Sequence, residues 1–350
     1  MVSSSYCRSR GTLRPVAARH AAAHMTQDVV SALAANFERH EIDAQLHDVP
    51  PHAVYEVRVD GRRAVCKVAR GPTAEPETEA AVIDHVDRHT DLPVASVLAA
   101  GEGYFVASWL DGLPTDDAVP DSADIDEAYA RALGRTLGRL HGATAGTFAR
   151  PGFPRVGRWD DSEGALAVDA RTRWIDVVRN FLDGLADDLA STDWVDPVRE
   201  VRRLVDDRPD LFAGAGNPVL CHGNLLPDHV GFATDGNSDP AAPAAVVDFE
   251  HALVAPGEYD VWRTATPLFG PPDDSPSPGM AAFRRGYESI RPLPDGFERR
   301  RDGYLLLNLA SYFLALAVQQ DGIGPDERPK AEGMSEAVSD LVSTVRDRRL

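Results

Sequence analysis

The alternation of apolar and polar positions predicts strands near the beginning of the chain. Residues 54–59 alternate in this way, and a second alternating run covers residues 64–68. Asp60-Gly61 lies between the two runs, and an Asp-Gly pair favours the two-residue turn of a tight β-hairpin. A further apolar run, GYFVASWL at residues 103–110, predicts another strand.

Apolar residues recur at helical spacing in several segments. Residues 75–89 begin with three glutamates and Pro76 and continue with apolar positions three and four residues apart, as helix N-termini prefer. A second amphipathic run, residues 125–142, ends at Gly142 and predicts a helix with a glycine C-cap. Further helices are predicted over residues 174–185, 279–290, 301–319 and 331–347.

The centre of the chain alternates short strands with loops. Strands are predicted at residues 218–221, 230–233 and 244–249, and the proline-rich stretch 267–278 predicts a surface loop. Strands dominate before residue 110 and helices after it. The pattern therefore suggests a strand-rich lobe over residues 25–110 and a helical lobe over residues 111–350.

Charge excludes some classes of partner. The 350 residues contain 55 acidic and 36 basic side chains, a net charge of −19, and a surface this negative repels nucleic acids and anionic membranes. The basic residues are almost all arginine, since Lys67 and Lys330 are the only lysines. This composition resembles that of a halophilic protein, so the net charge says little about the substrate.

The cysteines and the chain ends bear on the compartment. Three widely spaced cysteines without a C-x-x-C pair predict neither disulfides nor a zinc site, which favours the reducing cytoplasm. The apolar run 304–318 is shorter than the roughly 20 residues of a membrane span and predicts a buried helix. Residues 1–24 contain arginines but no acid, which suggests a disordered or misassigned extension, with Met25 as the start.

Lys67 stands out because it interrupts an apolar strand, AVCKVA. A buried ammonium is costly unless it is paired or holds an anion. Glu79, in the predicted helix that follows, is a candidate partner, an arrangement that kinases use to direct a lysine at nucleotide phosphates. A strand lysine paired with a helix glutamate also occurs in purely structural roles, so this pair alone leaves both interpretations open.

Two later segments carry a more specific signal. Residues 220–230 read LCHGNLLPDHV and residues 246–250 read VVDFE. They resemble the aminoglycoside phosphotransferase and choline kinase-like family, whose catalytic loop reads H-G-D-x-x-x-x-N and whose metal-binding aspartate ends a later V-[IV]-D-[FW]-E strand. The resemblance covers residues 27–320, and further landmarks follow in the family's order: Lys67, Glu79, 108–112, 140–141, 258–260 and 282–287.

This resemblance implies an α+β, two-lobed, protein-kinase-like fold, in which a small N-lobe with an antiparallel sheet and a helix lies over a larger helical C-lobe. It implies an ATP-dependent phosphotransferase that acts on a hydroxyl of a small molecule. Lys67 would then hold the nucleotide phosphates, Glu79 would orient Lys67, and Asp248 would bind Mg²⁺. Backbone groups from Ala107 to Leu110, including Ser108, would meet the adenine.

The chain departs from the family pattern at three places. Asn224 replaces the catalytic aspartate, and an amide cannot accept a proton from the acceptor hydroxyl. His229 replaces the metal-binding asparagine, which favours Mn²⁺ over Mg²⁺ or empties one metal position that Asp228 could fill instead. The loop expected over the phosphates, residues 47–52, reads HDVPPH and lacks glycine. His222 is expected to brace the catalytic loop.

Two functions therefore stay open: a small-molecule kinase, and a pseudokinase that binds nucleotide or a protein without efficient transfer. Three weaker interpretations concern other residues. Cys221-His222 could form a thiol nucleophile, but a buried strand cysteine explains it better. Tryptophans could line a cage for a quaternary amine, although their helical spacing favours the core. His47 and His52 lack metal-ligand spacing with a third group.

Overall fold

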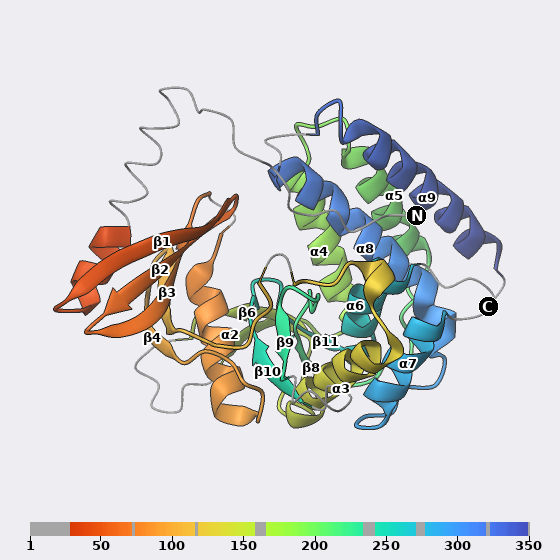
Figure 1. Cartoon of the computed structure of the whole chain (residues 1–350). Helices are drawn as coiled ribbons and strands as arrows, with labels where there is room; N and C mark the ends of the chain where they lie inside the picture. The colour runs from red at the N-terminus through yellow and green to blue at the C-terminus, as the bar shows by residue number, and fades with distance from the viewer. Residues whose placement is uncertain are drawn as a thin grey trace.

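The computed structural model describes residues 29–71, 74–115, 118–157, 166–233, 242–270, 277–319 and 323–348. It has a strand-rich N-terminal part and a helical C-terminal part, which lie side by side in Figure 1. The predicted α+β fold class, with an antiparallel sheet over a helical lobe, is confirmed. The expectations for residues 1–24 and Met25 fall outside the described residues.

The N-terminal part is built on a five-stranded antiparallel sheet. The spatial order is β1-β2-β3-β5-β4. The predicted hairpin is confirmed, and its turn residues Asp60 and Gly61 have φ values of 50° and 83°. Both angles lie in the left-handed region that a type I′ turn requires. The strands span β1 His40–Val49, β2 His52–Val59, β3 Arg62–Ala69, β4 Val97–Gly101 and β5 Tyr104–Ser108.

The two faces of this sheet bury different residues. Val57 and Cys66 on one face pack with Val29 and Leu33 of a helix at residues 29–36. Phe105 lies on the other face, in the same core as the helix α2, Pro76–His89. The helix α2 begins with a proline and acidic residues in its first turn, as predicted. The second face therefore points toward the rest of the molecule.

The C-terminal part combines helices with short strands. The strands form the sheets β7-β6-β11-β8 and β10-β9. The helix α3 packs against α7 at close range, because Gly134 lies where an added Cβ would be 2.0 Å from the Phe283 carbonyl oxygen. The helices are α3 Glu127–Ala143, α4 Trp174–Asp188, α5 Val195–Asp207, α6 Gly257–Phe269, α7 Pro278–Glu288, α8 Phe297–Gln319 and α9 Arg328–Asp347. The short elements are η1 Ser122–Asp124, β6 Gly152–Arg155, β7 Ala167–Ala170, β8 Pro218–Cys221, β9 Val230–Phe232, β10 Pro243–Val246 and β11 Leu253–Pro256.

Several element boundaries differ from the predictions. The helix α3 continues through Gly142 and has Thr144 at its C-cap, so the predicted glycine cap is wrong. The strand expected over 244–249 ends at Val246, because Asp248 has a φ of 67° that a strand cannot contain. The loop expected over 267–278 is shorter, because residues 267–269 belong to α6 and Pro278 begins α7; residues 271–276 fall outside the described residues.

The apolar run 304–318 lies in α8, and its residues 304–317 are buried or half-buried, with Tyr304 and Leu306 fully inaccessible to solvent. This confirms the prediction of a buried helix. In the described part of the chain, no helix is long and apolar enough to cross a membrane.

Candidate functional site

The Lys67 ammonium group contacts three carboxylates. Its Nζ lies 2.7 Å from Oε2 of Glu79, 2.9 Å from Oδ1 of Asp248 and 2.8 Å from Oε2 of Glu250. Lys67 comes from β3, Glu79 from α2, and the other two from the segment after β10. The structure thus brings together the three predicted residues Lys67, Glu79 and Asp248 and adds Glu250.

The charged groups of this cluster shift one another's pKa values. Burial by itself lowers the pKa of Lys67, but the three carboxylates outweigh it and raise that pKa well above 10.5. Burial tends to raise the pKa of Asp248, yet Lys67 and His229 hold it at about 2. For Glu79 burial dominates and raises the pKa to about 7. Lys67 and Asp248 are therefore both charged at neutral pH.

The loop that carries His222 and Asn224 is held in place by hydrogen bonds to Asp260. The backbone N–H groups of His222 and Gly223 donate to its carboxylate at 2.6 and 2.9 Å. Arg263 donates from Nε to the Gly223 carbonyl oxygen at 3.0 Å. Gly223 has a φ of 81°, and an added Cβ would lie 2.0 Å from the His251 carbonyl oxygen, so this position requires glycine.

The ring nitrogens of His222 contact backbone groups, and its ring packs on Phe249 with the ring centroids 4.5 Å apart. Its Nε2 donates to the Val247 carbonyl oxygen at 2.9 Å, and its Nδ1 accepts from the Asn224 N–H at 3.3 Å. Burial lowers the pKa of His222 to about 4, so the ring is neutral at pH 7. These contacts are those of a residue that braces the loop.

His229 connects the loop to Asp248. Its Nδ1 donates to the Asn224 carbonyl oxygen at 2.8 Å, and its Nε2 lies 3.1 Å from Oδ2 of Asp248. Burial lowers the pKa of His229, but Asp248 and Asp228 outweigh it, so the net pKa lies above 6.5. The structure therefore places His229 beside Asp248, whereas the Asp228 side chain is 55% exposed and 3.6 Å from the His229 ring.

Ser108 is the last residue of β5, and Leu110 follows two residues later. Ser108 pairs with Ala64, which is three residues, or about 10 Å, from Lys67 along β3. The N–H groups of Ser108 and Trp109 already donate to the carbonyl oxygens of Ser96 and Arg63. These two N–H groups are therefore not available to a ligand in this arrangement.

Glu250 and His52 are site residues that the sequence analysis did not select. His52, at the start of β2, places Nδ1 2.8 Å from Oε2 of Glu250. Glu250 was visible as the last residue of the VVDFE motif, but its direction depends on the backbone turn at Asp248. The nearness of His52 depends on the sheet register, which the spacing of two histidines cannot reveal.

The weaker interpretations find no support. Cys221 is fully buried, and burial raises its pKa well above the ordinary value, so it is not a reactive thiol. Trp174, Trp194 and Trp262 are at most 9% exposed and belong to the main core. Trp159 lies outside the described residues.

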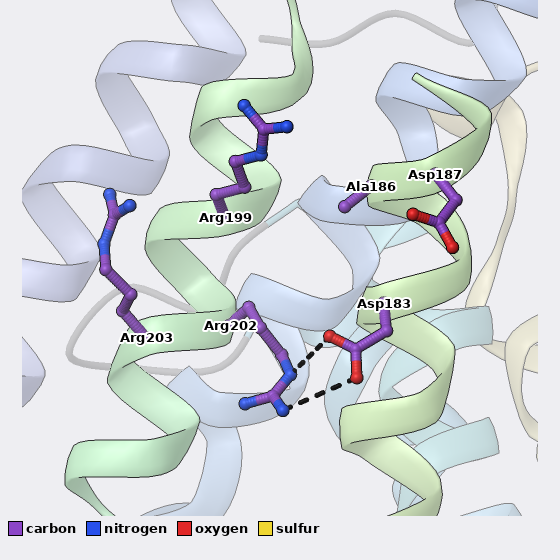
Figure 2. Close-up of a pocket in the computed structure, with 6 residues that line it drawn as sticks. All are labelled: Asp183, Ala186, Asp187, Arg199, Arg202 and Arg203. Atoms are coloured by element: carbon purple, nitrogen blue, oxygen red, sulfur yellow. Dashed lines mark hydrogen bonds and ion pairs between the residues drawn. The ribbon is translucent and has the colours of Figure 1, made fainter. Parts of the chain in front are cut away.

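Two cavities can be compared with the position of the Lys67 cluster. A cavity of about 380 Å³ between α4 and α5 is lined by Arg199, Arg203 and the paired Arg202 and Asp183, and none of the predicted site residues borders it (Figure 2). A smaller cavity of about 200 Å³ is lined by His52, Glu79 and Glu250, among others. The smaller cavity therefore adjoins the charged cluster and is the relevant one.

Comparisons with known proteins found a matching family and a curated relative. The model of a phosphotransferase enzyme family, APH, matches residues 51–293. A protein from Synechocystis sp. named probable ketoamine kinase is 26% identical over 231 residues, which cover 63% of this chain and 65% of that protein. The chain thus matches just under two thirds of the length of this curated relative.

Two kinds of solved structure share the fold. A thermostable mutant of aminoglycoside phosphotransferase APH(4)-Ia, in a ternary complex with ADP and hygromycin B, has a TM-score of 0.57 at 17% identity, covering 90% of this chain and 98% of that one. A microcompartment-associated aminopropanol kinase has a TM-score of 0.55 at 17% identity, covering 92% and 96%. At these identities the likeness establishes the fold alone.

Proposed function

Because the chain belongs to the APH phosphotransferase enzyme family, we propose that it transfers the γ-phosphoryl group of ATP to a hydroxyl group of a small molecule. One observation carries the proposal. Glu79 on α2 holds the Lys67 ammonium group beside Asp248, with distances of 2.7 and 2.9 Å to the two carboxylates. This is the arrangement that kinases use to bind nucleotide phosphates next to a metal.

The nucleotide is assigned to residues of both parts of the molecule. Lys67 binds the α- and β-phosphates, and Glu79 orients Lys67 through their ion pair. The adenine lies against the backbone after β5, between Ala107 and Leu110. Because the Ser108 N–H is already bonded, its carbonyl oxygen and the Leu110 N–H are the groups assigned to the base.

The donor set near Lys67 suits a divalent cation. Asp248 and Glu250 each bring carboxylate oxygens beside Lys67, and oxygen donors suit Mg²⁺. Asp248 is the principal ligand, and the neighbouring imidazole of His229 increases the preference for Mn²⁺. When bound, the cation neutralises charge on the phosphates.

The acceptor hydroxyl is expected near Asn224. This amide can position a hydroxyl by hydrogen bonding but cannot take its proton, and losing a general base costs about 10²–10⁴ in rate. A pseudokinase, which binds nucleotide without efficient transfer, is therefore the second candidate function, and Asn224 is the observation that favours it. Relatives named for ketoamine and aminopropanol make ketoamines and amino alcohols the first acceptors to test.

The experiment measures phosphoryl transfer from ATP to a panel of ketoamines, amino sugars and amino alcohols, with Mg²⁺ or Mn²⁺, at low and multimolar KCl. Metal-dependent transfer that Asp248→Asn abolishes, while Asp228→Asn retains it, supports the kinase. Asp228 is the matched control because it is an exposed carboxylate near the same histidine. ATP binding without transfer, together with transfer by Asn224→Asp, supports the pseudokinase. If ATP does not bind at all, the kinase and the nucleotide-binding pseudokinase both fail, and a pseudokinase that binds only a protein is left.

A further inference from the structure

The turn between β1 and β2 faces the charged cluster but lacks the usual phosphate-binding groups. Residues 47–52 contain Pro50 and Pro51, which have no N–H, and contain no glycine. Loops that hold phosphates normally do so with successive backbone N–H groups. If this chain binds a nucleoside triphosphate, side chains must supply donors that the turn backbone does not.

The sheet register places His47 on the same face as Lys67. His47 pairs with Val54 across β1 and β2, and Val54 pairs with Lys67 across β2 and β3. Directly paired residues of antiparallel strands point to the same face, with neighbouring strands about 4.8 Å apart. The His47 imidazole is therefore two strands, or about 10 Å, from Lys67 along one row.

The charges around His47 are those of the site. Burial has the largest effect on its imidazole and lowers its pKa, and the charged groups that act on it are Asp248, Lys67, Glu250 and the adjacent Asp48. His47 is nevertheless exposed as a whole residue, so a ligand can reach it from solvent. An imidazole here lies at the phosphate end of the proposed nucleotide site.

His52 ties the turn between β1 and β2 to Glu250 of the charged cluster. It lies on the same face as Val54, two residues along β2, and its Nδ1 is 2.8 Å from Oε2 of Glu250. The His52 side chain is only 8% exposed. At the other side of the turn, Arg70 donates from its backbone to the Pro51 carbonyl oxygen at 2.7 Å and pairs with Asp48. These contacts hold the turn over the cluster.

From this geometry we propose that the His47 imidazole binds the β- or γ-phosphate of the nucleotide, in place of backbone N–H groups, and that His52 is a positioning residue that ties the turn to Glu250. The proposal rests on the proposed function, since it names a phosphate contact of the same site. It makes the HDVPPH turn a phosphate-binding element that acts through a side chain.

The test compares the affinities of adenosine, AMP, ADP and ATP, with Mg²⁺, for the full chain and for His47→Ala. A hydrogen bond to a charged group contributes about 1.5–3 kcal/mol, so ATP should bind about 10-fold or more weakly to the variant. Adenosine should bind unchanged. His40→Ala is the matched control, because His40 pairs with Val59 at the other end of β1, on the opposite face of the sheet.

His52 needs a separate pair of variants. His52→Ala should weaken ATP but not adenosine, whereas His52→Asn, which keeps a donor near the position of Nδ1, should restore ATP affinity. The proposal is overturned if the wild-type chain binds both ligands and His47→Ala binds ATP as tightly as the wild type, or loses ATP and adenosine equally. If the wild-type chain binds neither ligand, the proposed function fails first, and the phosphate contact fails with it.

Discussion

At the residue scale, the site is a cluster of four charged side chains, in which Lys67 forms ion pairs with Glu79, Asp248 and Glu250. A lysine inside an apolar strand already requires a partner, and Glu79 could be found from the sequence for this reason. Asp248 could be found because its motif is recognisable. Glu250 could not, because its approach to Lys67 depends on the left-handed backbone at Asp248, with a φ of 67°.

Asn224 provides the first prediction. In Asn224→Asp a carboxylate stands where the family has its catalytic aspartate, so the rate of phosphoryl transfer should rise by about 10²–10⁴. The rate is measured with the acceptor panel at saturating ATP. A rate that stays at the wild-type level would show that proton transfer at this position does not limit the reaction.

Gly223 provides the second prediction. Gly223→Ala introduces a left-handed alanine, at a cost of about 1–2 kcal/mol, and a Cβ that meets the His251 carbonyl oxygen. Gly146 is the matched control, since its φ is 80° but an added Cβ meets nothing within 4 Å. Urea unfolding should show a larger loss of stability for Gly223→Ala than for Gly146→Ala. Equal losses would mean that the catalytic loop yields easily to the added Cβ.

At the element scale, α2 carries a buried histidine whose ring is unpaired. His85 is 4% exposed, and neither of its ring nitrogens has a hydrogen-bond partner among the described residues. The ring stacks on His89 and lies 5.6 Å from the Phe148 ring, beyond the end of α3. Burial lowers the pKa of His85 to about 4, so the folded protein keeps this ring neutral.

This gives a prediction for the pH dependence of stability. The unfolded chain protonates His85 near pH 6.5, whereas the folded protein resists protonation until about pH 4. The free energy of unfolding should therefore fall as the pH drops from 6.5 to 4, by on the order of 3 kcal/mol from this residue. His85→Leu should be more stable than the wild type below pH 6, in urea unfolding measured from pH 4 to 8.

The control for this prediction is His89→Leu, which changes an exposed histidine one helical turn away. Because burial outweighs His89 in lowering the pKa of His85, this variant should lose only a minor part of the wild-type pH dependence, much less than His85→Leu loses. If His85→Leu loses stability with acid as steeply as the wild type, the buried ring is not responsible.

The sequence predicted the elements that are marked by residues within or next to them. The hairpin followed from Asp60-Gly61, and α2 from the proline and glutamates at its start. The helix α5 was not predicted, although Val198, Val201 and Val205 are spaced as on one helical face and are buried. The strands β1, β4, β6, β7 and β11 were also missed. The last three have only four residues each, and all five are defined by pairing with other strands, which a local pattern does not contain.

At the scale of the whole molecule, the two parts are joined by close backbone contacts. The Val246 N–H donates to the Pro93 carbonyl oxygen at 2.8 Å. Gly231 of β9 lies against the chain after β5, where an added Cβ would be 1.8 Å from the Gly112 carbonyl oxygen. These contacts hold the N-terminal part against β9 and β10 of the C-terminal part. The family resemblance predicted the two-part arrangement, but not these contacts, because they join residues more than 100 positions apart.

The central claim is that Lys67 and Asp248 form a working nucleotide and metal site, and the most direct measurement is the thermal unfolding of the full chain with ATP and Mg²⁺, ATP and Mn²⁺, or ATP and a chelator. At 100 times Kd, binding stabilises the folded protein by about 2.7 kcal/mol. We expect a metal-dependent rise in the melting temperature, larger with Mn²⁺ because of His229, that disappears in Asp248→Asn. An unchanged melting temperature under every condition, at saturating ATP, would contradict the account.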